Sequence, residues 1–378
     1  MSVDRVSRRG LLVGLSLLLG ACSLFGSSKP KPAELPALSG PSVVTVAWRQ
    51  RIGRGGVGFQ PAYADGSIWA ASEKGLVYRI EATSGKVLWQ TDLDKPLMAG
   101  VGTDGKVAVV ATRDGYLQAL DADGQRKWAV NIGSEAMSLP VVGEGMVVVR
   151  TSSNRMFAFD LASGERRWVF QRQNPPLVLR QTSIPTIDAG VVYVGMPGGR
   201  LVALGADSGA VRWEAAVSQP KGSNEIERIS DVVGATPVAD SLVCAASYQG
   251  RLGCYDAASG RPSWVREFSS STGPAMDRRQ VALVDDKDQI HLFSRTGGST
   301  WRNEKYKLRE LSAPLLIDDY VLVGDARGLV HALARDDGAA VGRAETDGSP
   351  IIGAPVAAGS MAVVQTTSGS VYGLALKR

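Results

Sequence analysis

Two cysteines in the body of the chain are placed where they could react with each other. Cys244 and Cys254 lie in "LVCAASYQGRLGCYD", symmetrically about Gln249 in a Gly-containing turn. Residues directly opposite each other on a β-hairpin come within the range that a disulfide needs. A cross-strand bridge is geometrically strained, however, and small buried thiols are common in protein cores. The sequence therefore leaves both a disulfide and a pair of buried thiols open.

The two histidines, His291 and His331, stand three positions into successive copies of a repeat described below. They would occupy equivalent strands, and a metal pair is conceivable, but no carboxylate or cysteine close in the sequence completes a ligand set. Packing or surface placement is the favoured interpretation. Carboxylates concentrate in turns such as 121–124, where Asp bonds to the backbone. The sequence also lacks the G-x-S-x-G, P-loop, H-E-x-x-H and C-x-x-C motifs, so it predicts no metal, no cofactor and no enzyme activity.

The third cysteine, Cys22, follows a short apolar run. Residues 1–21 have a basic start and an apolar stretch closed by small residues, as in an export signal. Leu19-Gly20-Ala21-Cys22 resembles a bacterial lipobox, which predicts cleavage before Cys22 and acylation of its thiol; the alternative is an ordinary signal with a chance cysteine. Two or three acyl chains would anchor the protein stably. Ser23, rather than Asp, follows the cysteine, and the resemblance to enterobacterial lipoprotein sorting implies the outer membrane, on its periplasmic side. The export route, general or twin-arginine, stays open.

Residues 22–42 are predicted to be the lipidated cysteine and a flexible, Pro-rich tether. The net charge is +5, and removing residues 1–21, which contain three Arg and one Asp, lowers it to +3. That value and the predicted export argue against a nucleic-acid partner. Hydrophobic residues at 44% and charged residues at 21% are typical of a soluble globular domain.

The remainder, 43–378, repeats one motif eight times. Short β-branched runs split by Asp/Gly turns precede each copy, so one unit is about four strands in about 40 residues, the period of a propeller blade. Within a copy, positions two and five after the start, such as Val77 and Ile80, are always apolar. These positions point to opposite faces of a strand, so both faces are buried. The copies start at 75, 115, 154, 199, 250, 288, 328 and 369.

The count also predicts how the ring closes. The last copy stops at residue 378 without its final strand, whereas "VVTVAW" (43–48) precedes the first unit unpaired. Pairing the two completes an all-β, eight-bladed β-propeller of four-stranded blades and removes an open edge. A tryptophan then marks one strand in each of seven blades, with Val341 at that position in the remaining blade. Inter-blade packing is the expected role of Trp48, Trp89, Trp128, Trp168, Trp213, Trp264 and Trp301.

The A-x-x-G-x-x-x-W ending of the repeat resembles that of the pyrroloquinoline-quinone (PQQ) propellers. The vicinal Cys-Cys and the calcium-ligand insertions of those dehydrogenases are missing, so their cofactor is not expected. Lipobox, length and eight blades together resemble the BamB family of outer-membrane lipoproteins. The resemblance implies a scaffold in the β-barrel assembly (BAM) complex that binds the periplasmic POTRA domains of BamA. Other BAM subunits and unfolded outer-membrane proteins are further expected partners.

Two long connections carry the more specific marks of that family. "NPPLVLRQTSIP" (174–185) contains a Leu-x-Leu-Arg pattern at Leu177, Leu179 and Arg180, and "NEIERISDVVGATPV" (224–238) contains an Arg-x-Ser-Asp-Val pattern with Arg228 and Asp231. The resemblance implies that these five residues contact BamA. A second acidic residue that the family carries is replaced by Val233. Exposed leucines beside an arginine suit an interface anchor, although the leucines could instead pack back onto the propeller.

Two alternatives remain open for function. One is a degenerate PQQ-type periplasmic dehydrogenase or a hydrolase, and the other is a propeller that binds a ligand or cell-wall glycan in its central channel.

Overall fold

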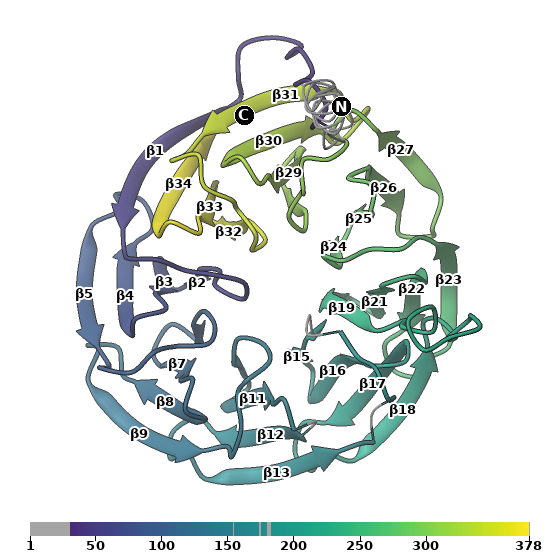
Figure 1. The fold of residues 1–378 in the computed structure, drawn as a ribbon. Coiled ribbons are helices and arrows are strands. Elements are labelled where there is room, and N and C mark those ends of the chain that lie inside the picture. Colours follow the sequence, from purple (N-terminus) through teal and green to yellow (C-terminus); the bar gives the residue numbers. More distant parts are fainter. Residues whose placement is uncertain (1–30, 154, 174, 180–182, 378) are drawn as a thin grey trace, which may run out of the picture. The chain divides into compact units, whose positions relative to one another are not determined.

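The computed structural model describes residues 31–153, 155–173, 175–179 and 183–377. The described residues form strands and turns, and no helix among them is long and apolar enough to cross a membrane. The predicted signal peptide and Cys22 lie outside the described residues. Residues 33–378 form one compact unit, in which eight β-sheets stand around a central axis (Figure 1). The predicted eight-bladed β-propeller is confirmed.

The first four blades are antiparallel sheets whose strands follow one another from the axis outward. Their strands are β2 (Ala62–Ala64), β3 (Ser67–Ala71), β4 (Leu76–Glu81) and β5 (Val87–Asp92) in blade 1; β6 (Gly102–Thr103), β7 (Ala108–Ala111), β8 (Tyr116–Leu120) and β9 (Arg126–Asn131) in blade 2; β10 (Val141–Gly143), β11 (Met146–Arg150), β12 (Arg155–Asp160) and β13 (Arg166–Gln171) in blade 3; and β15 (Thr186–Asp188), β16 (Val191–Met196), β17 (Arg200–Gly205) and β18 (Val211–Ala216) in blade 4.

The second half of the ring follows the same plan, with one addition in blade 5. Its strands are β14 (Ser183–Ile184), β19 (Val232–Ala235), β20 (Val238–Ala239), β21 (Leu242–Ser247), β22 (Arg251–Asp256) and β23 (Pro262–Glu267) in blade 5; β24 (Pro274–Met276), β25 (Gln280–Val284), β26 (Ile290–Ser294) and β27 (Ser299–Asn303) in blade 6; β28 (Leu315–Ile317), β29 (Tyr320–Gly324), β30 (Leu329–Ala334) and β31 (Ala340–Glu345) in blade 7; and β32 (Val356–Ala358), β33 (Met361–Gln365), β34 (Ser370–Leu376) and β1 (Val44–Arg51) in blade 8.

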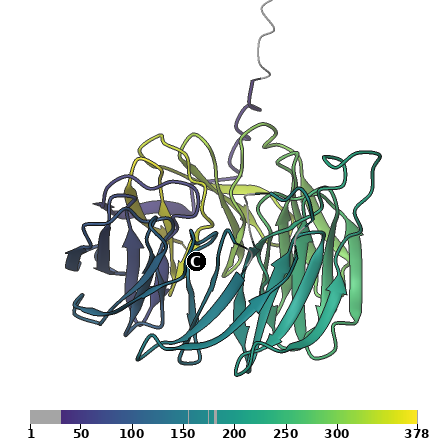
Figure 2. The ribbon, with the colours of Figure 1, turned by 60° about the horizontal axis from the view of Figure 1, so that its bottom comes forward.

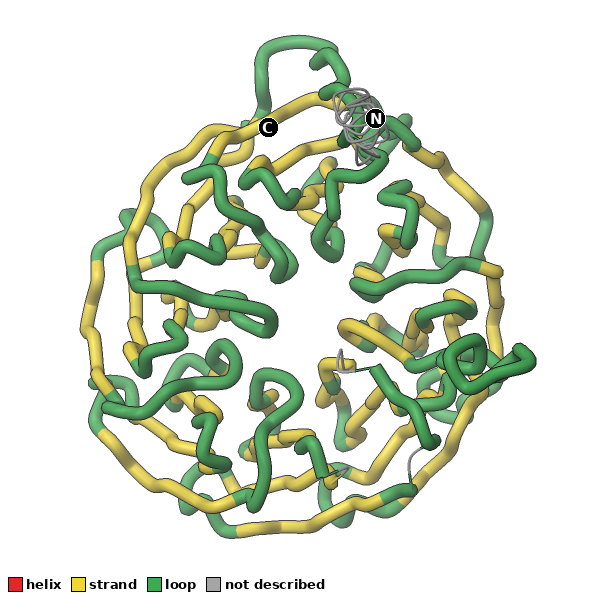
Figure 3. The backbone as a smooth tube through the Cα atoms, in the orientation of Figure 1, coloured by secondary structure: helices red, strands yellow, loops and turns green. Residues whose placement is uncertain are grey.

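Ring closure occurs as predicted. The N-terminal strand β1 pairs antiparallel with β34, from Val44 opposite Leu376 to Arg51 opposite Ser370, and becomes the outer strand of blade 8. Figure 3 shows the continuous outer circle of strands that results.

The core lies between the blades, because the second strand of each blade buries both of its faces. All five residues of β11 are buried. Val147 and Val149 face blade 2, whereas Met146 and Val148 face blade 4. Among the described residues, eight such clusters occupy the eight blade junctions. At about 25 cal/mol per Å² of apolar area removed from water, these junctions are the main favourable term in folding.

The tryptophans join neighbouring blades through a repeated contact. Each tryptophan on an outer strand donates its indole N–H to a backbone carbonyl in the next blade, and the turn glycine of that blade packs against the indole ring. At Gly164, for example, an added Cβ would lie 2.7 Å from the Trp128 ring, and the backbone has φ +76°, a region that favours glycine. The donors Trp48, Trp89, Trp128, Trp168, Trp213, Trp264 and Trp301 bond to Ala82, Ala122, Leu161, Ala206, Ala257, Arg295 and Arg335.

The outer strand of blade 7 carries no tryptophan to make this contact with blade 8, and the predicted Trp-equivalent residue there was wrong by one position. Gly342, not Val341, lies opposite Ala332, as Trp301 lies opposite Leu292 one blade earlier. The β-bulge between Ala332 and Leu333 sets this register. A Cβ on Gly342 would lie 2.9 Å from Val43 and 3.0 Å from Val44. The start of β1 therefore fills the space that a tryptophan occupies elsewhere.

The described part of the predicted tether differs from a free linker. Residues 33–42, here called the strap, run along the outside of blade 7 (Figure 1). The backbone N–H of Ala33 donates to Lys307 O at 2.9 Å, and that of Ser39 donates to Ala340 O at 3.0 Å. The Ser42 hydroxyl bonds to Arg343 O at 3.1 Å. Backbone groups of blades 6 and 7 therefore hold the segment, and polar composition alone did not reveal them.

Candidate partner-binding surface

The two long connections singled out in the sequence meet in space. The first one ends in β14, which pairs in parallel with β19 at the end of the second one, with Ser183 opposite Gly234 and Ile184 opposite Ala235. The inner strand of blade 5 is thereby split into β19 and β20 and extended by β14, so this blade has more than the four predicted strands. This extra pairing makes the two connections one structural unit.

The buried carboxylate of Asp231 holds this unit together through hydrogen bonds to backbone N–H groups. Its side chain is buried, with 4% exposure. One carboxylate oxygen accepts the backbone N–H of Leu179 at 2.6 Å, and the other accepts the backbone N–H of Gly198 at 2.9 Å. Hydrogen bonds from N–H groups to a carboxylate are stronger than neutral ones. Asp231, predicted as a partner contact, thus binds the first connection and blade 4 of its own chain.

A buried arginine lies close to this carboxylate. Arg150, at the end of β11, is 5% exposed and lies near Gly195 O, at 3.4 Å. Burial lowers the pKa of Arg150 to about 10, and the negative charge of Asp231 opposes that shift. The pair supplies opposite charges inside the propeller below the two connections, where an unpaired charge would be costly.

Residues 219–229, which lead into the second connection and include its first part, form a loop that stands clear of the ring (Figure 2). The Asn224 side chain accepts the Glu227 N–H at 2.9 Å, and the Glu227 carboxylate accepts the Ser223 N–H at 2.7 Å. This reciprocal arrangement resembles a helix capping box. The backbone N–H and hydroxyl of Ser223 lower the pKa of Glu227. The loop is therefore held in shape by its own side chains.

Arg228 belongs to the same internal network. Its Nε donates to Gly222 O at 3.1 Å, and its Nη1 lies 3.5 Å from Glu225 Oε1. The side chain is 49% exposed. It closes the base of the loop and still presents half of its surface to solvent.

Apolar side chains are exposed on both connections. Leu177 and Val178 are 44% and 36% exposed, whereas Leu179 is half-buried. Arg180 lies outside the described residues. Ile226, at the tip of the loop, is 67% exposed. Ile226 was not predicted as a contact residue, although an isoleucine within the polar run "SNEIER" is a sign of an exposed apolar side chain. Because exposed apolar side chains grouped on structured loops mark interaction sites, these residues define the candidate surface: Leu177, Val178, Leu179, Ile226 and Arg228.

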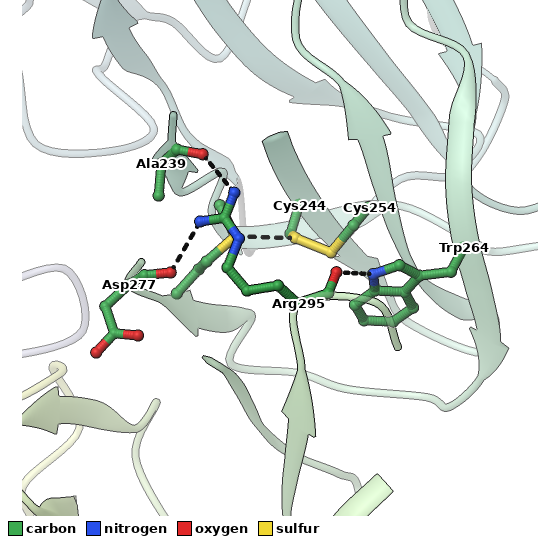
Figure 4. The surroundings of a disulfide bond; sticks show 7 residues. Ala239, Cys244, Cys254, Trp264, Asp277 and Arg295 are labelled. Atoms are coloured by element: carbon green, nitrogen blue, oxygen red, sulfur yellow. Dashed lines mark hydrogen bonds between the residues drawn. A yellow bond between two sulfur atoms is a disulfide. The ribbon is translucent and has the colours of Figure 1, made fainter. Parts of the chain in front are cut away.

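The cysteine pair lies in the core of the blade that carries this surface. Cys244 is opposite Cys254 in the β21–β22 pair, with a Cα–Cα distance of 4.1 Å, and the two form a buried disulfide (Figure 4). Trp264 donates to Arg295 O at 2.8 Å, and the Arg295 guanidinium donates to Ala239 O and Asp277 O. The disulfide therefore braces blade 5 beside its junction with blade 6.

The two histidines are packing residues of blades 6 and 7. Each has a carboxylate partner that was not predicted from the sequence: His291 Nε2 lies 2.9 Å from Asp285 and His331 Nε2 lies 3.0 Å from Asp325. Both imidazoles are buried. Over the residues that the structure describes, no group of three or more His, Cys, Asp or Glu side chains could hold a metal ion.

A shallow depression of about 630 Å³ lies between blades 2 and 3, away from both connections. Charged residues of both signs line it, among them Asp121, Lys127, Asp160 and Arg167. Its position between two blades differs from the central-channel site that the ligand-binding alternative requires.

The fold and the surface define a class of protein, an eight-bladed β-propeller with PQQ-like repeats and two elaborated blade connections. Propellers of quinone enzymes share this fold: the chain superimposes on the quinohemoprotein alcohol dehydrogenase of Comamonas testosteroni with a TM-score of 0.67 at 16% identity, over 88% of this chain and 76% of that one. Similarity at that level concerns the fold alone.

Closer relatives give the family. A family model described as outer membrane protein assembly factor BamB matches residues 45–130, 73–304 and 293–378. Outer membrane protein assembly factor BamB of Burkholderia pseudomallei is 40% identical over 360 residues, covering 94% of each chain, and that of Escherichia coli is 33% identical over 97% of this chain and 99% of its own. The crystal structure of BamB from Moraxella catarrhalis has a TM-score of 0.81 at 31% identity, over 88% of this chain and 100% of that one. The chain belongs to the BamB family, as predicted.

Proposed function

We propose that this protein is a non-catalytic scaffold of the β-barrel assembly complex that promotes the assembly of outer-membrane proteins. The relatives that share nearly its whole length are named as assembly factors rather than as enzymes. Acylation of Cys22 holds it on the periplasmic side of the outer membrane, and the candidate surface binds the POTRA domains of BamA. Further contacts with other BAM subunits and with unfolded outer-membrane proteins belong to the same role.

One observation carries the proposal: Asp231 joins two connections, each of which exposes apolar side chains. A free loop would lose conformational entropy on binding, and that loss weakens affinity. Here the β14–β19 pairing and the Asp231 hydrogen bonds have already ordered the first connection. Ile226 and Leu177 then act as apolar anchors, and Arg228, on the same loop as Ile226, adds a charged contact. Arg180, which lies outside the described residues, belongs to the proposed contacts through its place in the sequence alone. Asp231 shapes the surface from beneath.

The test compares single substitutions that bury no charge in the free protein. Leu177→Asp and Ile226→Asp should each weaken binding to purified BamA POTRA domains at least tenfold, about 1.4 kcal/mol, with the melting temperature unchanged. Leu88→Asp is the matched control, because Leu88 is 45% exposed on β5, at the opposite side of the ring (Figure 1). Wild-type affinity in both surface variants would refute this location of the interface.

A further inference from the structure

The strap ends on a buried arginine. Arg309 is 4% exposed and divides its guanidinium between Asp325, at 2.9 Å, and Ala33 O, at 2.8 Å. Arg343 donates to Pro36 O at 2.8 Å. Two guanidinium groups and the Lys307 carbonyl therefore fix the strap over blade 7 as far as Ala33.

This attachment shortens the free chain between the propeller and the proposed anchor. Ala33 is eleven positions after Cys22, and a fully extended chain spans about 3.3–3.6 Å per residue, or roughly 36–40 Å in all. A tether free up to β1 would have twice as many residues. The start of the strap, at Ala33 beside Lys307, can therefore lie no further from the proposed membrane anchor than this extended length.

The loop at that point presents an unusual leucine. Leu308 is 50% exposed and has φ +61°, and Glu310 has φ +54°; a bulky residue in the left-handed region is strained. The Asp288 carboxylate holds this backbone by accepting the N–H groups of Arg309, Glu310 and Leu311 at 3.0, 3.1 and 2.8 Å. The fold thus maintains a conformation that turns an apolar side chain outward.

The surroundings of Leu308 are amphipathic. Lys305 and Lys307 are exposed on the same loop, and Leu35 of the strap is 37% exposed. Lys307 lies 3.8 Å from Glu304, and Glu304 also pairs with Arg302. Lysines that flank exposed leucines are typical of surfaces that lie at a lipid interface, where the ammonium groups meet phosphates and the apolar side chains enter the headgroup layer.

We propose that the surface formed by Leu35, Lys305, Lys307 and Leu308 rests on the phospholipid headgroups of the membrane that holds Cys22. The strap positions this surface, so the lipid anchor orients the propeller as well as retaining it. The inference rests on the proposed acylation of Cys22. It deepens the proposed function, because it sets which blades face the bilayer while blades 4 and 5 remain available for a protein partner.

The test uses the full-length lipoprotein in vesicles of phosphatidylethanolamine and phosphatidylglycerol. An environment-sensitive fluorophore is attached to Leu308→Cys or, as a matched control, to Val169→Cys on β13 of blade 3, across the ring, where Val169 is 48% exposed. Quenching by spin-labelled lipids should be at least threefold stronger at position 308 than at 169. Adding Lys305→Glu and Lys307→Glu should reduce that quenching while the protein still sediments with vesicles.

Each contrary outcome has a distinct meaning. Equal quenching at both positions, with normal sedimentation, would overturn the orientation and leave the anchor intact. Loss of sedimentation would refute the anchor and, with it, this inference. A Leu308 probe that responds to soluble envelope proteins but not to vesicles would assign the surface to a protein partner and overturn the lipid assignment.

Discussion

The Asp231 carboxylate accepts a hydrogen bond from the backbone N–H of Leu179 at 2.6 Å, although 52 residues separate them in the chain. Because the same carboxylate accepts from Gly198, Asp231→Ala should leave two N–H groups without an acceptor and Arg150 without its nearby anion. We expect a loss of about 2–4 kcal/mol in the free energy of unfolding, measured by urea denaturation, and weaker POTRA binding.

Asp231→Asn should have a smaller effect, since the amide oxygen can keep one acceptor. Glu225→Ala is the control, because Glu225 is half exposed on the neighbouring loop and its removal should change stability by less than about 0.5 kcal/mol. An Asp231→Ala protein as stable as the wild type would contradict the role assigned to this carboxylate.

The contact between tryptophan and glycine can be separated from backbone strain. Gly164 and Gly133 both have φ +76°. A Cβ added at Gly164 would collide with the Trp128 ring, whereas a Cβ added at Gly133 would have no atom of another described residue within 4 Å, its chain neighbours aside. Gly133→Ala should therefore cost about 1 kcal/mol for the left-handed backbone alone. Gly164→Ala should cost about 1–3 kcal/mol more because of the collision, as measured by thermal unfolding. Similar losses of stability in the two variants would show that the contact between Trp128 and Gly164 does not stabilise the blade junction.

Removing the disulfide should destabilise blade 5. Ten positions separate Cys244 from Cys254, and the chain-entropy account of a loop of that size predicts a loss of about 2–3 kcal/mol. The Cys244→Ala/Cys254→Ala double variant should show this loss in urea denaturation. Full stability of the double variant would mean that packing alone holds β21 against β22.

Stability should fall in mild acid because of His331. Burial lowers the pKa of His331, and the positive charges of Arg309 and Arg343 add to the shift, against the opposing effect of Asp325. The unfolded chain then binds a proton below about pH 6.5, where the folded chain does not. The stability contributed by the neutral imidazole is thus present above pH 6.5 and is lost as the pH falls below it.

Phe157 occupies the equivalent position of blade 3, so His331→Phe is a suitable substitution. It should flatten the dependence of the urea midpoint on pH between 7 and 5, where the carboxylates of unfolded chains are still largely ionised. An unchanged slope in this variant would show that His331 is not the group responsible.

The architecture could be predicted because a motif of about 40 residues recurs along the chain and both faces of its strands are apolar. Val77 and Ile80, on opposite faces of β4, are one example. The equivalence of Gly342 to the tryptophans could not be predicted. A β-bulge shifts the strand register by one residue there, and the pattern of apolar residues does not indicate such a shift. The strap was missed because it is held through backbone carbonyls such as Ala33 O, which side-chain composition does not report.

The candidate surface was predicted in part. Leu177 and Arg228 are exposed on the connections where the family resemblance placed them. Asp231 was predicted as a partner contact from the family resemblance. In the structure it is buried where the two connections meet. Ile226 had no support from the motif, and its exposure depends on the turn that Asn224 and Glu227 close.

The pairing of Val44 with Leu376 joins positions 332 residues apart. The ribosome makes β1 before every other strand of the ring and β34 last. The edge of β1 that pairs with β34 therefore stays unpaired until the whole chain has been made. Any prematurely terminated product lacking Ser370 onward would keep that edge bare permanently, with Trp48 missing its opposite strand. Such a truncated chain would leave unpaired the edges of both β1 and β33, which β34 covers in the complete ring.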